Sequence, residues 1–488
     1  MRSKTGIWNF CVVLRNAVGR VQLTTISLLI LGSVSQTKDP KLPDTVWITF
    51  FFSLCGFCGL LSFSRPGVAI GLLMCIFGIE SLLQSQAGFF VDNGRYVNFG
   101  IGAVVAIAAI GCVLRKPKSL SQVRTAQWLV YVLFVYAFTS LMWTLAPERS
   151  ASWVKSLPYC GTYLLLAPLL TRQKNALADG LRWALLIGVP VLLLMAFYCE
   201  WGHRGLILSK PILTDLGIDR ETQPLATASL GASLAIIALV AHFKKAVGFW
   251  LRFLIFALGL YISFKTEARG QVLAVIGVSA IIYPISNRAT SIKGAVKTSI
   301  GFAVVGLTAY FLFQSLELVR FDGARFESAI EGRRSLTNGL LDYWASHIGA
   351  FTIMGFGASS SWRVIGGYPH NLPIEILFEL GLIGFGIFIS IVVVCTRNGL
   401  QVLSRLEGEP QLRSQIVALI GIIGLLLAES LKSGTLYNWQ SLFFFLVCLD
   451  QQVTVKTKKL GSVKKALKGL FVLPVNAPRD PAFRRQAF

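Results

Sequence analysis

The sequence predicts an all-α membrane protein, a polytopic bundle of about 12 to 14 transmembrane helices. Of its 488 residues, 54% are hydrophobic and 14% are charged, whereas a soluble domain has about 25% charged residues. Many apolar runs have the roughly 20 residues that a membrane-spanning helix needs. A span in lipid must satisfy its own backbone hydrogen bonds, and these runs lack the apolar–polar alternation of barrel strands. They are therefore expected to be helices.

The apolar runs follow one another with short connections. We expect spans at 22–37, 45–63, 67–83, 96–114, 126–145, 158–171, 182–198, 225–242, 247–264, 270–286, 297–317, 371–395, 414–431 and 436–450. Together they predict a single integral membrane domain over residues 1–450. The chain has no phosphate-binding loop, no dinucleotide fingerprint and no HExxH zinc motif.

Basic residues are distributed unevenly between the two sets of loops. The chain carries a formal charge of +23, and most of its Lys and Arg fall in every second loop and in the tail at 451–488. This positive-inside bias predicts that both termini are cytoplasmic. A basic cytoplasmic tail suits the anionic lipids of the inner leaflet. The charge pattern therefore favours membrane lipids as partners over nucleic acid.

Two segments on the opposite side are longer than the rest, 199–224 and 318–370. In a protein whose other loops are minimal, a long loop is usually functional. Apolar residues recur at helical spacing in the second segment and predict an amphipathic helix. They are Leu336, Leu340, Trp344, Ile348 and Phe351. Such a helix would either plug the bundle or offer its apolar face to a substrate.

Two of the candidate functional positions lie where a span begins on this same side. Arg269 precedes Gly270 at a tight reversal, which would aim its guanidinium into the bundle or leave it as an interfacial anchor. His370 opens the span at 371–395, and Glu379 follows on the same helix. A carboxylate inside a span is costly and marks function by default. Glu379 would orient His370 or pair with an arginine. The structural alternative is a helix N-cap with an ion pair.

Further arginines lie in the two long segments. Arg333, Arg334 and Arg220 would each be solvated surface residues if considered alone. Together with Arg269 and His370 they suit an anionic ligand, because the guanidinium binds phosphate bidentately and histidine is the usual base near neutral pH. We expect no metal and no cofactor, since no acidic cluster on this side has the pattern of a divalent-metal site.

The stretch 200–395 resembles the shared core of the O-antigen ligases and O-antigen polymerases. The reversal at Arg269-Gly270 is similar to the family's Ser-Arg-Gly at a span end. The segment EGRRSLTNGLLDYWASHIGAFTIMGFGAS is similar to its loop pattern of an arginine, a tryptophan and Gly-x-Gly. The run HNLPIEILFELGLIG resembles the family's His-Asn and Glu-x-Gly-x-x-Gly, which here are His370, Asn371, Glu379, Gly381 and Gly384. The sequence departs from the pattern at Ala268, where the family has serine, and after Arg220, where many members have Pro-Asn.

The resemblance implies a glycosyltransferase of the bacterial inner membrane with a periplasmic active site. The donor would be a glycan on undecaprenyl pyrophosphate. The acceptor would be a sugar hydroxyl on lipid A–core for a ligase, or on a second carrier-linked glycan for a polymerase. Arg269, with Arg220, Arg333 and Arg334 as helpers, would bind the pyrophosphate. His370 would accept the hydroxyl proton and Glu379 would orient it.

Two other classes of protein remain open at the level of sequence. A flippase for lipid-linked glycans would have as many spans, but its charges should lie along the midplane of a central cavity. Here the candidate charges gather at one face, which favours an enzyme. A structural membrane subunit would use His370 and the arginines only to cap helices.

Overall fold

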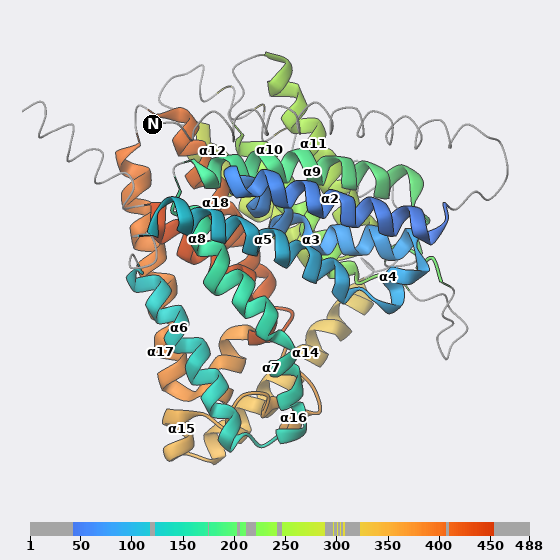
Figure 1. The fold of residues 1–488 in the computed structure, drawn as a ribbon. Coiled ribbons are helices and arrows are strands. Elements are labelled where there is room, and N and C mark those ends of the chain that lie inside the picture. Colours follow the sequence, from blue (N-terminus) through green and yellow to red (C-terminus); the bar gives the residue numbers. More distant parts are fainter. Residues whose placement is uncertain are drawn as a thin grey trace, which may run out of the picture.

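A computed structural model of the chain describes residues 42–117, 123–173, 175–202, 205–210, 221–241, 246–287, 323–406 and 409–452, and a few single positions between 288 and 322. Throughout these residues the regular elements are helices, and the only strand-like pairs are two isolated bridges within 201–221 (Figure 1). This confirms the predicted all-α class. The expected span at 22–37, most of that at 297–317 and the basic tail from 453 lie outside the described residues.

One group of helices packs side by side in the upper part of Figure 1. It comprises α2 (Asp44–Ser64), α3 (Gly67–Gln86), α5 (Arg95–Arg115), α9 (Ala176–Tyr198), α10 (Pro224–Val240), α11 (Ala246–Lys265), α12 (Arg269–Asn287) and α18 (Pro410–Ser430). Close packing between α10 and α11 depends on glycine: a Cβ added to Gly231 would lie 2.6 Å from the carbonyl oxygen of Gly259. Small residues of this kind let membrane helices approach each other closely.

A second group extends to the lower lobe of Figure 1. The long helices α6 (Thr125–Ser140) and α17 (Leu372–Arg405) run down one side of it. The remaining members are short or belong to the long loop: α7 (Ser150–Cys160), α14 (Gly323–Ser346), α15 (Ala350–Met354) and α16 (Ser361–Ile365). The short helices α4 (Gly88–Asp92) and α8 (Ala167–Thr171) lie with the upper group. Residues 440–452 form a final described helix.

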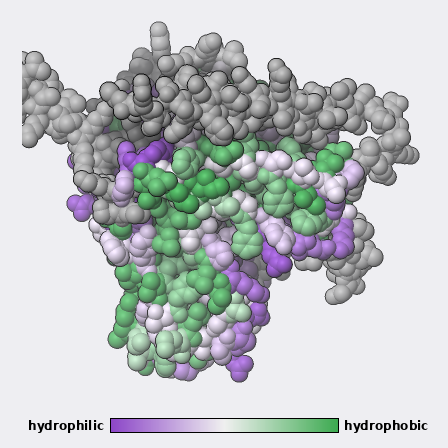
Figure 2. Space-filling view, viewed as in Figure 1, coloured by the Kyte–Doolittle hydropathy of each residue, from purple (hydrophilic) through white to green (hydrophobic). Residues whose placement is uncertain are grey.

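Membrane character follows from length and composition. Seven helices in the described part of the chain are long and apolar enough to cross a bilayer, and two shorter apolar helices, Pro224–Val240 and Gly270–Ser286, accompany them. Large apolar side chains such as Val135, Leu186 and Leu254 are exposed on their outward faces. Figure 2 shows apolar surface over much of the described helices on the side in view. An exposed apolar surface of this extent suits lipid as the surrounding solvent.

The segments that connect the helices meet at two opposite ends of the bundle, as expected for helices that alternate in direction. At one end, which we call the basic end, Arg115 donates to the carbonyl oxygens of Phe63 and Ser64, and Arg413 donates to that of Ile285. At the other end, which we call the loop end, Lys210 pairs with Asp92 at 2.8 Å. The loop end also carries α14, α15 and α16. The alternation that the charge pattern predicts is therefore present in the described helices.

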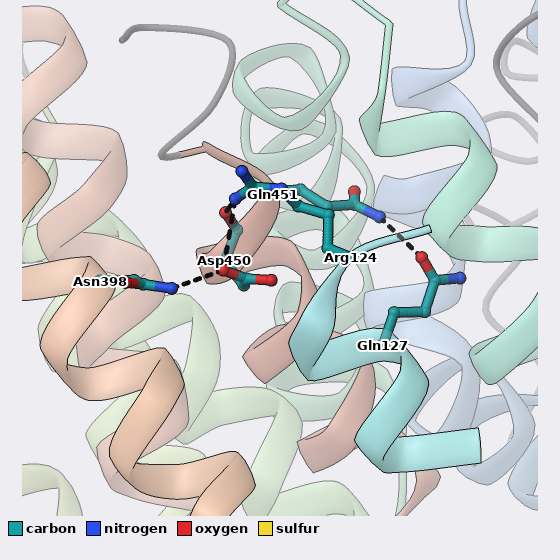
Figure 3. A network of polar contacts seen from close by, with 5 residues as sticks. All are labelled: Arg124, Gln127, Asn398, Asp450 and Gln451. Carbon is teal, nitrogen blue, oxygen red and sulfur yellow. Dashed lines mark hydrogen bonds and ion pairs between the residues drawn. The ribbon is translucent and has the colours of Figure 1, made fainter. Parts of the chain in front are cut away.

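A polar cluster closes the basic end (Figure 3). Asp450 is 3% exposed and accepts hydrogen bonds from Asn398 at 2.7 Å and from Arg124 at 3.3 Å. Gln451 continues the cluster towards Gln127 and accepts a hydrogen bond from Thr171. These bonds join α6, α8 and α17 to the final helix, which are far apart in the sequence.

Candidate functional site

The long loop begins with the helix that its apolar spacing predicts. In α14, Leu340 is fully buried against Phe356 and Phe378, and Trp344 packs on the same cluster. The expected stripe nevertheless stops with the helix at Ser346. Ile348 is 79% exposed, whereas Phe351, in α15, is 47% exposed and stacks on Phe356 of that cluster. Residues 347–349 separate α14 from α15, and Gly349 precedes α15 with a φ of +158°.

Backbone geometry joins this loop to a kink in α17. At Gly381 φ is +63° and ψ is −165°, which interrupts the helix within a span. The interruption leaves the carbonyl oxygens of Phe378 and Glu379 without helical donors. They accept hydrogen bonds from the backbone N–H groups of Phe356 at 3.1 Å and Gly357 at 2.9 Å. Backbone N–H groups of the loop thus replace the hydrogen bonds that the helix loses at the kink, which a backbone inside a membrane requires.

The Glu379 side chain lies in the same junction and is 3% exposed. One oxygen accepts from the backbone N–H of Ser359 at 2.7 Å, and the other accepts from the Ser361 hydroxyl at 2.7 Å. These contacts differ from the expected ones, because among the described residues the carboxylate binds the loop and not His370 or an arginine. Glu379 therefore positions the 355–361 turn. A direct role towards His370 stays a prediction.

Several side chains of the α6–α7 connection anchor the turn from the other side. The Tyr136 hydroxyl donates to the carbonyl oxygen of Met354 at 2.6 Å, and Thr144 donates to that of Ala358 at 2.6 Å. The Trp153 indole donates to the Ser359 hydroxyl at 3.1 Å. The loop is consequently held by buried polar contacts at a defined place over the bundle.

His370 follows the anchored turn after α16 and a short connection, and it is partly buried. Its φ of +53° is a left-handed conformation that non-glycine residues adopt infrequently and that often marks functional sites. On one side of it the Tyr368 hydroxyl bonds that of Tyr437 at 2.6 Å. On the other side Asn371 caps α17 by accepting from the Ile374 N–H at 3.3 Å. The cap that the structural alternative expected is therefore present, at Asn371.

Glu375, one turn into α17, connects this region to the 431–439 segment. The side chain is 2% exposed, and one of its oxygens accepts from the Leu436 N–H at 3.1 Å. This bond brings the residues that follow α18 beside the start of α17. Lys432 belongs to that segment.

Lys432 is the cation that the sequence interpretation overlooked. Its Nζ donates to the Gln271 side chain at 3.0 Å, and its side chain occupies the space beside Gly270 that a Cβ would need. Burial and the nearby positive charge of Arg333 lower the pKa of Lys432 to about 8, against the opposing effect of Glu429. Lys432 thus lies against the backbone that carries Arg269.

The positive charge of Arg333 also affects the pKa of His370. Burial and then the Arg333 guanidinium lower the pKa of His370 below its usual value, so the imidazole is mainly neutral at pH 7. One exposed guanidinium from α14 therefore influences both His370 and Lys432. The loop end gathers groups from α12, α14, α17 and the segment after α18 around one electropositive region.

The remaining predicted residues have different positions. Arg269 is the first residue of α12, next to Gly270, and its side chain lies outside the described part of the structure. Arg220 lies wholly outside it. Arg334 is exposed on α14 beside Arg333. The structure therefore brings Arg333, His370 and the Arg269 backbone to one end of the bundle.

A sequence signal existed for one of the overlooked residues. Glu429 lies inside the α18 span and is 3% exposed, so the rule that drew attention to Glu379 applies equally to it. Lys432 follows the end of a span, a position at which an interfacial anchor is the ordinary expectation. Only the packing against Gly270 and Gln271 distinguishes it.

No model of a known protein family matches this chain, and no characterised protein matches it either.

Proposed function

We propose that this protein is a membrane glycosyltransferase of the bacterial inner membrane. It would transfer a glycan from undecaprenyl pyrophosphate to a sugar hydroxyl at the loop end, which the charge bias assigns to the periplasm. The observation that carries the proposal is the contact of Lys432 with Gln271 and Gly270, directly after Arg269 at the start of α12. The sequence resemblance to O-antigen ligases and polymerases supplies the reaction class.

The cations suit the departing pyrophosphate. Lys432 and Arg333 lie close enough to interact electrostatically, and Arg269 begins the helix that Lys432 touches through Gly270 and Gln271. Preorganised cations stabilise the charge that develops on a leaving phosphate in the transition state, worth on the order of 3 kcal/mol per group. Arg334 and Arg220 remain proposed helpers in the same binding.

The histidine suits the acceptor hydroxyl. A general base must be neutral before the reaction, and burial beside Arg333 favours neutral His370. The hydroxyl oxygen would attack the anomeric carbon while its proton passes to the imidazole. The bond between that carbon and the pyrophosphate oxygen would break, and its electron pair would leave with the pyrophosphate. Glu379 would contribute by holding the 355–361 turn, which precedes His370 in the same loop.

Purified protein in lipid nanodiscs tests the role of the histidine. With a short undecaprenyl-pyrophosphate-linked glycan as donor and acceptor, the measured quantity is released undecaprenyl pyrophosphate. His370→Ala should lower the rate roughly 100- to 10,000-fold, because proton transfer loses its base. The matched control is His347→Ala, an exposed histidine of the same loop, which should keep the rate. Full activity in His370→Ala would refute the assignment.

A pair of glycine variants tests the cation site without removing a charge. Gly270→Ala would push the Lys432 side chain from its place, because that side chain fills the space of the new methyl group. Transfer should fall at least ten-fold while the protein still folds. Gly277→Ala, on the same helix with open space around it, should leave transfer unchanged. Equal activity in the two variants would remove Lys432 from the site.

The same assay separates the proposal from the alternatives. A flippase would move the carrier-linked glycan across the membrane without consuming it, and a structural subunit would do neither. Deletion of the gene then distinguishes the two transferases. A ligase requires loss of polymer from lipid A–core while carrier-linked polymer accumulates. A polymerase requires collapse of the glycan ladder to one repeat unit.

A further inference from the structure

A cavity of about 510 Å³ lies beside the candidate site. Its walls come from α3, α7, α10, α12, α18 and the 433–445 segment. One part of the wall is apolar, with Phe77, Leu230 and Phe444. The other part is rich in hydroxyl and amide groups. These are Ser156, Ser229, Ser233, Gln271, Asn438 and Gln440.

The polar part of the wall reaches deep between the spans. Ser233 lies more than two turns inside α10, about 14 Å along the helix from Pro224. Polar groups at such a depth are costly unless they have partners, and in membrane proteins they usually mark a ligand path. Aromatic side chains with hydroxyl or N–H groups, Tyr159, Tyr437 and Trp439, stand among them. A sugar ring with several hydroxyl groups suits such a wall. Its hydroxyls can exchange hydrogen bonds with the hydroxyl and amide groups, and its ring can lie against the aromatic side chains.

Glu429 provides the second, independent observation. It lines this cavity and is 3% exposed. One of its oxygens accepts from the Ser229 hydroxyl at 3.1 Å. The other oxygen is buried and has no hydrogen-bond partner among the described residues. A buried carboxylate oxygen without a donor carries a large desolvation cost, which a ligand hydroxyl would offset.

The cavity and the candidate site share their boundary. Gln271 lines the cavity and binds Lys432, and Tyr437 lines it and bonds Tyr368 two residues before His370. A sugar in the cavity would therefore lie next to both the cations and the histidine. We propose that this cavity binds a neutral saccharide and that the free oxygen of Glu429 accepts a hydrogen bond from one of its hydroxyls. Its role as the acceptor subsite rests on the proposed transfer reaction.

Saturation-transfer NMR on the full chain in lipid nanodiscs tests the binding itself. The probes are the methyl glycosides of glucose, galactose and N-acetylglucosamine. The wild-type chain should bind at least one of them. Glu429→Gln should bind it roughly ten-fold more weakly, because an NH2 donor replaces one of the two carboxyl oxygens. Ser233→Phe, which fills the cavity, should abolish the signal.

Control variants and unfolding measurements distinguish a loss of sugar binding from a loss of the fold. Glu148→Gln, an exposed carboxylate at the same end, should bind as the wild type does. Thermal unfolding of every variant checks the fold. Absence of binding to all three probes, or equal affinity in wild type and Glu429→Gln, overturns this inference. Sugar binding without any transfer would sink only the proposed reaction. Transfer with an unchanged acceptor KM in Glu429→Gln would sink only the sugar subsite.

Discussion

At the scale of single residues, the site depends on how one exposed arginine affects the pKa of two partly buried residues. Arg333 contributes to lowering the pKa of both His370 and Lys432, and burial contributes more in each case. The lowered pKa has a different consequence for each of the two residues. A lowered pKa keeps the histidine neutral as a base, and it brings the lysine close to losing its charge. The lysine must keep that charge to bind phosphate.

The pH dependence of transfer follows from these directions. The rate should rise as His370 loses its proton below pH 6.5 and fall as Lys432 loses its own near pH 8. Arg333→Gln removes a positive charge, which raises the pKa of both groups. Both limbs of the kcat/KM profile should then move to higher pH. Arg95→Gln, an exposed arginine at the same end, should move neither. If both limbs of the kcat/KM profile stay at the same pH in Arg333→Gln, Arg333 does not influence His370 and Lys432 as proposed.

At the scale of elements, the junction between α15 and the kink of α17 organises the loop. Gly355 has φ +82° and Gly357 has φ +93°, and both approach other backbone closely. Together with Gly381 they allow loop amides to reach the carbonyl oxygens of Phe378 and Glu379. The glycine patterns at 355–357 (GFG) and 379–381 (ELG) thus contact each other in the folded protein. Their spacing alone did not indicate that they meet.

Two glycines of α17 offer a matched test of this junction. Gly381→Ala places a methyl group against the backbone of Gly355 and Ile353 at a left-handed φ, and should destabilise the protein by about 2 kcal/mol or more. Gly386→Ala, with open space around it in the same helix, should change the stability by less than about 1 kcal/mol and in the stabilising direction.

Thermal unfolding in detergent measures the difference. Cys75, Cys395 and Cys448 are buried free thiols, so a thiol-reactive dye reports their exposure. Equal midpoints for Gly381→Ala and Gly386→Ala would mean that the kink does not depend on glycine.

At the scale of the whole molecule, the two ends of the bundle serve different purposes. The loop end carries the cavity and the cations. The basic end holds helices together through the Asp450 cluster of Figure 3. Asp450 lies near the end of the described chain, yet it binds α6 and α17, so it secures the final helix, whose early residues line the cavity.

Removing this carboxylate should weaken the bundle. Asp450→Ala removes the carboxylate that pairs with Arg124 and accepts from Asn398, while Arg124 keeps its hydrogen bond to the residue 450 carbonyl oxygen. The change should cost on the order of 2 kcal/mol. Asp179→Ala removes an exposed ion pair with Arg182 at the same end and should cost less than about 1 kcal/mol. The same dye assay compares the two. If both variants melt at the same temperature, the cluster does not secure the bundle.

Hydrophobicity and charge along the chain determine much of this protein, because each is a local property. Apolar length predicts the helices, and the bias of Lys and Arg predicts which connections meet at each end. The contacts within each end confirm that grouping. The positions of His370 and Arg333 at the loop end follow from the same alternation.

Only the tertiary structure decides which polar atoms meet. Glu379 follows His370 by nine residues but binds Ser359 and Ser361, while Lys432 reaches Gln271 and Glu429 faces a cavity. Partners of this kind are set by the packing of helices that are distant in the sequence, and hydrophobic periodicity carries no information about them.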